Sequence, residues 1–275
     1  MRLYAVAGSQ DAGLSVTAGY DAIAAGYDAQ VRGDAWMRRA LHELYARLFV
    51  PGQRVLDVGC GTGIDALALA RRGVRVVAID GAAEMVALLR EKVIAAGVSD
   101  LVDERVLRIE ALHDLADVIS ERFDGLISAF ASLSALPDLR QFADDASRLV
   151  RPGGRLVLHL LNRFSLWEWL GYLRQRDWRR AARLGRQRRR HFTIGGQSVE
   201  HTLYFADEAY DRFFRSDFWL RGAYGLGAIR PPHTVRRVPR RVAQTLEWLD
   251  VASGRWPLVR DRGRFFVLDL ERRAM

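Results

Sequence analysis

Short apolar runs alternate with segments of helical spacing through residues 36–161. The runs are rich in β-branched or aromatic residues and predict buried strands at Val55–Val58, Val76–Asp80, Arg105–Ile109, Phe123–Ser128 and Leu156–Leu161. Apolar residues recur at helical spacing over Trp36–Phe49, Ala66–Ala70, Ala82–Ala96 and Asp138–Val150. Alternating strands and helices predict an α/β fold with a parallel, doubly wound sheet, which binds ligands at the carboxyl ends of its strands.

The pattern changes after Asn162. An apolar stripe, formed by Leu166, Trp169, Leu170 and Leu173, predicts a helix, and Asp177 is suited to cap a second one. Further elements are expected at Val199–Phe205, Asp207–Arg215, Phe218–Tyr224 and Phe265–Leu270. Residues 163–198 and 227–262 are thus predicted insertions, and we interpret both as helical lids over the substrate.

The first predicted strand leads into a glycine-rich turn. Asp57 is followed by glycines at alternate positions, Gly59, Gly61 and Gly63, and then by the start of a helix. Glycines let backbone N–H groups approach a ligand, and the helix N-terminus favours an anionic group. A dinucleotide fingerprint needs a glycine where this chain has Ile64, so the spacing argues against a nicotinamide cofactor.

This motif resembles the first motif of the class I S-adenosylmethionine-dependent methyltransferases. A second feature agrees, because Asp80 ends an apolar run 23 residues after Asp57, where a carboxylate can accept both ribose hydroxyls. The resemblance implies a Rossmann-like sheet of seven strands, with the last strand antiparallel and inserted beside the sixth. It also implies S-adenosylmethionine as cofactor.

The resemblance assigns cofactor-binding roles to particular residues. An N-terminal helix bearing Tyr20 and Tyr27, seven positions apart and hence on one face, would cover the cofactor, although a plain docking helix fits equally well. Glu110 takes the place of the family's adenine-binding carboxylate, and a solvated loop glutamate is the alternative. The full predicted set is Tyr20, Tyr27, Asp57, Gly59, Cys60, Gly61, Gly63, Asp80, Glu110, Ala111 and Ser128.

Composition indicates one compact domain. The 275 residues are 49% hydrophobic, which suits one α/β domain over residues 18–275 behind a flexible tail at 1–17. No apolar run approaches the ~20 residues of a membrane helix, so we expect a cytoplasmic protein. Cys60 is the only cysteine, which excludes an internal disulfide and a zinc cluster, and no metal is expected.

Positive charge is concentrated in the C-terminal part. Residues 1–162 carry 18 basic and 21 acidic residues, whereas residues 163–275 carry 24 and 12. Arginines cluster at Arg176–Arg190, which leaves two alternatives to a lid open: a nucleic-acid-binding methyltransferase or adaptor, and a peripheral enzyme with tryptophans on an anionic membrane surface. Nucleic acid is the less favoured partner, because exposed aromatics do not interleave with the arginines.

Methyl transfer is an in-line displacement that depends mainly on orientation, and it needs a base only when the acceptor must lose a proton. Ser128–Ala131 replaces the Asp/Asn-Pro-Pro motif of base-methylating enzymes, and neither a free catalytic cysteine nor a lysine tetrad is present. These absences favour a small-molecule acceptor. His159 and His233 are the candidate bases, although an amine or an anionic carbon would need none. The oligomeric state is not set by the sequence.

Overall fold

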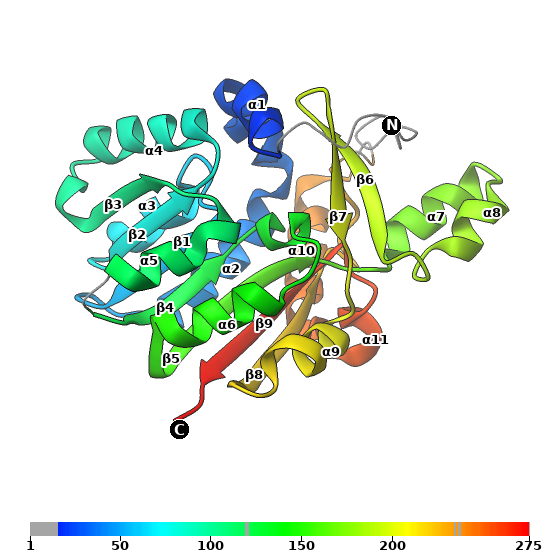
Figure 1. The fold of residues 1–275 in the computed structure, drawn as a ribbon. Helices are drawn as coiled ribbons and strands as arrows, with labels where there is room; N and C mark the ends of the chain where they lie inside the picture. Colours follow the sequence, from blue (N-terminus) through cyan, green and yellow to red (C-terminus); the bar gives the residue numbers. More distant parts are fainter. Residues whose placement is uncertain (1–15, 119–120, 234, 236–237, 275) are drawn as a thin grey trace.

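The computed structural model describes residues 16–118, 121–233, 235 and 238–274, and the predicted tail lies largely outside this part. A seven-stranded sheet has the order β3-β2-β1-β4-β5-β9-β8 (Figure 1). Its strands are β1 (Arg54–Val58), β2 (Arg75–Asp80), β3 (Val102–Val106), β4 (Phe123–Ser128), β5 (Val150–Leu161), β8 (Phe218–Leu226) and β9 (Phe265–Arg272). The predicted doubly wound α/β fold is confirmed.

Helices cover both faces of the sheet because the inner strands are apolar on both sides. On one face pack α5 (Leu112–Val118), α6 (Arg140–Leu149) and α9 (Ala206–Ala209), around residues such as Leu126 and Leu156. On the other face pack α2 (Ala35–Leu48), α3 (Ile64–Ala70) and α4 (Ala83–Ala95), around residues such as Ile127 and Val157. Neighbouring residues of one strand therefore belong to different cores.

The last strand confirms the expected topology. β9 lies between β5 and β8 and is antiparallel to both, with Leu158 opposite Leu268 and Ala223 opposite Leu268 on the other side. β5 and β8 therefore run in the same direction, and both reach the edge of the sheet at which β1 ends. The two insertions leave from this edge, as predicted.

The third strand lies earlier than predicted. β3 pairs Val102–Val106 with β2, and the chain then turns away, so that Ile109–Ala111 form a short 3-10 helix. The Leu107 N–H still donates to the Asp80 carbonyl at 2.9 Å. The predicted strand was placed too late because it included the apolar residues Leu107 and Ile109. These residues pack against the core from the turn rather than from the strand.

The first insertion is only partly helical, which corrects the prediction of a helical segment over 163–198. It contains α7 (Leu166–Arg174) and α8 (Trp178–Arg183), which project from one side of the molecule (Figure 1). Asp177 caps α8 as predicted, accepting the Arg180 N–H at 3.0 Å. The chain then forms a hairpin of β6 (Arg189–Ile194) and β7 (Gln197–Thr202), so the expected strand over Val199–Phe205 does not join the main sheet.

The second insertion is helical. It contains α10 (Arg240–Ser253) and α11 (Pro257–Arg260), both of which pack on β8. Arg39 of α2 donates to Glu247 of α10 at 3.0 Å, so the two helices lie on the same side of the sheet. Within the described residues, no helix is long and apolar enough to cross a membrane.

Candidate active site

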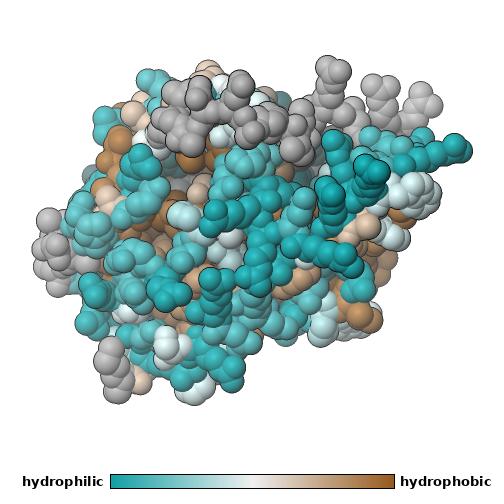
Figure 2. All heavy atoms as spheres, turned by 45° about the vertical axis from the view of Figure 1, so that its right-hand side comes forward, coloured by the Kyte–Doolittle hydropathy of each residue, from teal (hydrophilic) through white to brown (hydrophobic). Residues whose placement is uncertain are grey.

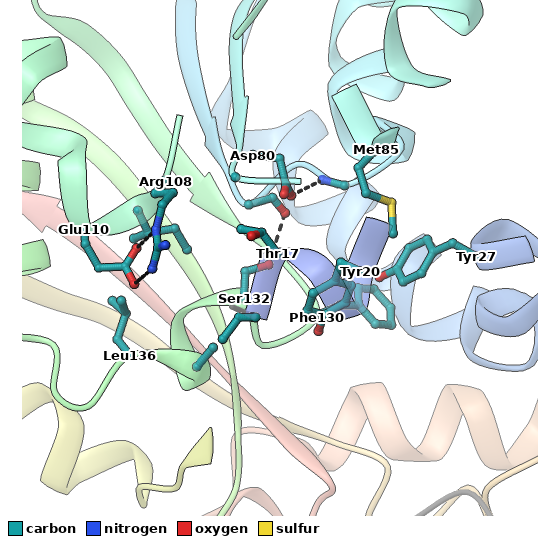
Figure 3. Close-up of a pocket in the computed structure, with 16 residues that line it drawn as sticks. Thr17, Tyr20, Tyr27, Asp80, Met85, Arg108, Glu110, Phe130, Ser132 and Leu136 are labelled. Atoms are coloured by element: carbon teal, nitrogen blue, oxygen red, sulfur yellow. Dashed lines mark hydrogen bonds and ion pairs between the residues drawn. The ribbon is translucent and has the colours of Figure 1, made fainter. Parts of the chain in front are cut away.

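A pocket opens at the carboxyl ends of β1, β2 and β4, beneath α1 (Val16–Val31) (Figure 3). Six predicted residues line it: Tyr20, Tyr27, Gly59, Gly61, Asp80 and Glu110. It is also lined by residues that the sequence did not single out, among them Thr17, Met85, Arg108, Phe130, Ser132 and Leu136. The structure therefore brings the glycine loop, the end of β2 and the N-terminal helix together.

The three loop glycines serve different purposes. All have positive φ, between 55° and 77°, which disfavours any other residue. A Cβ on Gly59 would collide with Ser132, and one on Gly63 would collide with Leu89. A Cβ on Gly61 would meet only the Tyr27 ring, at 3.8 Å. Gly61 therefore faces the pocket. Gly59 and Gly63, in contrast, must be glycines because a side chain would collide with residues packed against them.

Asp80 fastens the loop to the end of β2. Its Oδ2 accepts the Gly61 N–H at 2.8 Å, and its Oδ1 accepts the Ala82 N–H at 2.9 Å. Burial raises the pKa of Asp80, while these backbone N–H groups act in the opposite direction. A carboxylate has about four lone-pair positions, so both oxygens can still accept further hydrogen bonds from the pocket.

A smaller hollow continues behind the loop, and Cys60, Thr62 and Arg38 line it. Arg38 extends from α2, pairs with the buried Asp65 and lies 4.2 Å from the centre of the Phe130 ring. Burial raises the pKa of the Cys60 thiol well above its usual value, and the nearby carboxylates add to this effect. Asp65 also lines the hollow, which therefore offers the Arg38–Asp65 ion pair beside a neutral thiol.

The opposite end of the pocket carries an ion pair. Arg108 donates to Glu110 at 3.0 Å, and both side chains are about half exposed. Partial burial opposes ionisation of Glu110, yet the Arg108 guanidinium lowers its pKa overall. Glu110 is thus an anionic acceptor at the rim, next to Ile109.

Two carboxylates hold α1 over the pocket. Asp28 accepts Thr62 Oγ1 at 2.5 Å and Lys92 Nζ at 2.6 Å, and Asp21 accepts the Glu84 N–H at 2.9 Å. From the other side, the tip of the β6–β7 hairpin packs against α1, where Gly19 leaves no room for a side chain beside the Ile194 carbonyl. The hairpin, rather than α7, is the part of the first insertion that contacts the pocket's cover.

Five predicted residues lie outside the larger pocket. Cys60 lines the hollow behind the loop, and Gly63 begins α3. Asp57 and Ser128 are buried in β1 and β4, each with a side-chain oxygen that has no partner among the described residues. Burial raises the pKa of Asp57 well above its usual value, and the charge of Asp65 adds to this. Ala111 ends the 3-10 helix one residue beyond the lining.

The sequence matches a protein-family model over most of its length. A model described as "Methyltransferase domain" matches residues 30–203, more than half of the chain. The chain belongs to this methyltransferase family. The predicted family, and S-adenosylmethionine as the cofactor that it implies, are confirmed.

Individual relatives of this methyltransferase match over a shorter span. The ubiquinone biosynthesis O-methyltransferase of Xylella fastidiosa (strain 9a5c) is 39% identical over 117 residues, which are 42% of this chain and 45% of that protein. The protein of the same name from Xanthomonas oryzae pv. oryzae (strain PXO99A) is 41% identical over 118 residues, 43% and 47% of the two chains. The chain thus spans about half the length of the curated relatives it matches.

Solved structures share the fold of this methyltransferase. The CcbJ methyltransferase from Streptomyces caelestis aligns with a TM-score of 0.59 at 20% identity, covering 95% of this chain and 100% of that one. An S-adenosylmethionine-dependent methyltransferase from Clostridium acetobutylicum ATCC 824 aligns with a TM-score of 0.59 at 12% identity, covering 93% and 99%. At these identities the likeness concerns the fold.

His159, a predicted base of the methyltransferase, is placed behind the pocket. It is 1% exposed, and its ring packs against Phe265 and Phe130. Its Nδ1 accepts the Phe130 N–H at 3.1 Å, and its carbonyl accepts the Ala131 N–H at 2.9 Å. Burial lowers its pKa to about 3, with Arg38 adding to the effect. The geometry contradicts a role as base, because the ring does not line the pocket and binds protons weakly.

His159 instead holds a strained turn. Phe130 and Ala131 both have positive φ, 51° and 68°, which costs an L-residue about 1–2 kcal/mol each. The two hydrogen bonds to His159 fix this turn, and Phe130 lines both the pocket and the hollow behind it. His159 is therefore a positioning residue for the pocket wall.

Acid should destabilise the protein through His159. With a pKa of about 3 in the folded state and about 6.5 when unfolded, the unfolded chain binds more protons between these values. The free energy of unfolding should therefore fall with decreasing pH below about 6.5, by up to about 1.4 kcal/mol per unit. His159→Asn, which retains an acceptor near Nδ1, should make this dependence shallower in denaturant titrations from pH 7 to pH 4.

Two comparisons help to assign the pH dependence of stability to His159. His201 is also buried, and its pKa is lowered to about 4, so His159→Asn should reduce the pH dependence without removing it. His159→Leu removes the acceptor and leaves the Phe130 N–H unpaired, which should lower stability further at pH 7. An unchanged pH dependence in His159→Asn would contradict the buried, neutral state of the imidazole.

His233 lies away from the pocket. Its Nδ1 is 3.6 Å from Asp34, and its ring packs against Gly33 in the short 3-10 helix Arg32–Asp34. Arg264 also pairs with Asp34 at 3.0 Å, so the histidine belongs to a polar contact between the second insertion and the end of α1. His233 is not among the residues that line the pocket, which argues against it as the base.

Proposed function

We propose that this methyltransferase transfers the methyl group of S-adenosylmethionine to a small-molecule acceptor by in-line displacement. The observation that carries the proposal is the open side of Gly61, flanked by Asp80 and Arg38. A nucleoside with an amino-acid tail needs a close backbone approach, a carboxylate for its ribose and a cation for its carboxylate. These groups follow one another along the pocket, so the residues fit the cofactor.

Each end of the cofactor has a matching group. Asp80 would accept the ribose hydroxyls, Glu110 would accept from the adenine amino group, and Arg38 would face the methionine carboxylate. Tyr20 and Tyr27, in edge contact at 6.4 Å, would cover the centre of the cofactor. When bound, S-adenosylmethionine supplies an electrophilic methyl group on a sulfonium sulfur.

The space for the acceptor is apolar. The empty space of the pocket, counted together with the solvent at its mouth, is about 730 Å³. Phe130, Ala135 and Leu136 form its wall beyond the glycine loop. An apolar wall with few polar groups excludes water and orients a flat or hydrophobic molecule, which is the main requirement of a displacement.

None of the residues that line the described pocket is a histidine. Burial raises the pKa of Tyr27 to about 12, so its hydroxyl remains protonated and cannot take up a proton. We therefore propose an acceptor that reaches the pocket as a competent nucleophile, such as an ionised oxygen, an amine or an anionic carbon. The relatives named above carry O-methyltransferase in their names, which supports an oxygen acceptor.

Three arginines of the tract pair with carboxylates of the same chain, which weakens the case for a nucleic-acid partner. Arg189 pairs with Glu200 at 3.3 Å and Arg190 with Glu168 at 2.8 Å, while Arg188 lies 3.4 Å from Glu208. These guanidinium groups are already neutralised by carboxylates of the same chain. A phosphate backbone would have to replace those partners.

The proposal is tested by product formation. Purified protein is incubated with S-adenosylmethionine and a small-molecule extract of the host, and mass spectrometry compares metabolites with and without protein. We expect a metabolite that gains one methylene unit, together with S-adenosylhomocysteine. Binding of S-adenosylmethionine without any methylated product from extract or from phenol, catechol and amine panels would contradict a small-molecule acceptor.

A further inference from the structure

Large apolar side chains are exposed on the second insertion. Trp248, Trp256 and Leu258 are 68%, 66% and 71% exposed, although each would normally be covered. They belong to what we call the α10–α11 face, whose exposed apolar residues are Val242, Trp248, Leu249, Val251, Trp256 and Leu258. The opposite side of α10 packs inward through Ala243 and Asp250, so this helix has a defined outer face.

The acidic and basic side chains of this segment lie in different environments. Its carboxylates turn inward or toward partners: Asp250 accepts the N–H groups of Gly227, Ile229 and Arg230, Glu247 pairs with Arg39 and Arg230, and Asp261 pairs with Arg260. Its exposed arginines have no carboxylate partner among the described residues: Arg240, Arg241, Arg255 and Arg262. The exposed surface of this segment is therefore mainly apolar and cationic, although Asp207, which is 63% exposed, pairs with Arg260 of α11.

We propose that the α10–α11 face docks on an anionic lipid bilayer. Tryptophan and leucine bury their rings and chains at the boundary of head groups and acyl chains, while arginines bind lipid phosphates. Basic residues near an anionic surface are attracted to it, and salt screens this attraction. A binding site for a protein partner would more commonly mix both signs of charge around its apolar centre.

The first insertion is the weaker candidate. Only Leu170 and Trp178 are exposed large apolar residues on α7 and α8, at 40% and 64%. Figure 2 brings forward the side of the molecule that carries these helices, and hydrophilic side chains cover most of it. The membrane contact that the sequence suggested for the arginine-rich tract is thus better supported in the other insertion. This inference does not depend on the identity of the acceptor.

Co-sedimentation of the full chain with vesicles tests the proposal. Vesicles of phosphatidylcholine alone are compared with vesicles that also contain phosphatidylglycerol, at low and high salt. We expect binding only to the anionic vesicles and less of it at high salt. Trp248→Ala combined with Trp256→Ala should weaken binding at least tenfold, while Trp178→Ala, a change of an equally exposed tryptophan, should leave it unchanged.

Both variants should keep the wild-type melting temperature, because the replaced side chains are exposed. Their S-adenosylmethionine affinity should also be unchanged, since the face lies outside the pocket. Three results would overturn the proposal: no sedimentation with anionic vesicles at low salt, equal weakening by Trp178→Ala, or a wild-type dimer that the double variant converts to monomers. The last would identify the face as a contact between two copies.

Discussion

Gly61→Val should abolish S-adenosylmethionine binding while leaving a folded domain. The residue has a φ of 55° and its open side faces the pocket, where only the Tyr27 ring lies within 4 Å of an added Cβ. A valine side chain would occupy the space beside the loop that the proposed cofactor needs. The left-handed conformation adds only about 1–2 kcal/mol of strain, which the domain should tolerate. Calorimetry measures the binding, and circular dichroism measures the fold.

Gly63→Val is the matched control. Its Cβ would collide with Leu89 in the core, so this variant should lose stability as well as binding. The contrast separates a glycine required by a ligand from one required by packing. If Gly61→Val still turns over substrate, the loop is only a turn and our assignment of the cofactor site is wrong.

Asp80→Ala should weaken S-adenosylmethionine binding at least tenfold. The change removes the proposed acceptor of two ribose hydroxyls, and hydrogen bonds to a charged group contribute about 1.5–3 kcal/mol each. It also removes the acceptor of the Gly61 N–H, so the glycine loop loses one of its hydrogen bonds to β2 and keeps those from Gly59 and Cys60 to the Ile79 carbonyl. Calorimetric titration of the variant with S-adenosylmethionine gives the change in affinity directly.

Asp80→Asn helps to separate the contact with the ribose hydroxyls from the contact with the Gly61 N–H. The amide retains one oxygen acceptor and the size of the side chain, so its affinity should lie between those of the wild type and Asp80→Ala. Unchanged affinity in a folded Asp80→Ala protein would remove the main assignment of the site.

The sequence predicted the part of the site that lies on strand ends. Gly59, Gly61 and Asp80 follow short apolar runs, and parallel strands bring such ends together at one edge of a sheet. The order of the strands, with the last one antiparallel, followed from the family that this motif resembles. The local pattern and the fold agree for β1 and β2, because both strands are buried on both faces and such apolar runs fit few other structures.

Contacts between distant segments could not be predicted in this way. Arg38 resembles any other arginine of an amphipathic helix, and only the packing of α2 under the glycine loop brings it to Asp65. Phe130 faces the pocket because His159, 29 residues later, fixes a turn that its own sequence does not favour. A histidine inside an apolar strand looks the same from the sequence whether it is a base or a buried acceptor.

For a related reason, the sequence did not show which part of the first insertion contacts the cover of the pocket. The apolar stripe of Leu166, Trp169, Leu170 and Leu173 correctly predicted a helix, but helical spacing does not say which surface covers it. The residues that reach α1 belong to the β6–β7 hairpin, whose first strand alternates exposed and half-buried positions and begins with Arg189 and Arg190. Its glycine pair, Gly195 and Gly196, was the one local signal of a hairpin turn.

The position of β9 has a consequence for biosynthesis. β8 lies at the edge of the sheet and pairs only with β9, which the ribosome makes after it. While residues 227–264 are being synthesised, β5 therefore presents an unpaired apolar edge and β8 has no neighbour in the sheet. Unpaired strand edges are templates for association with other chains. Nascent chains should thus be most prone to aggregation, and most dependent on chaperones, in the interval before Phe265–Arg272 emerges.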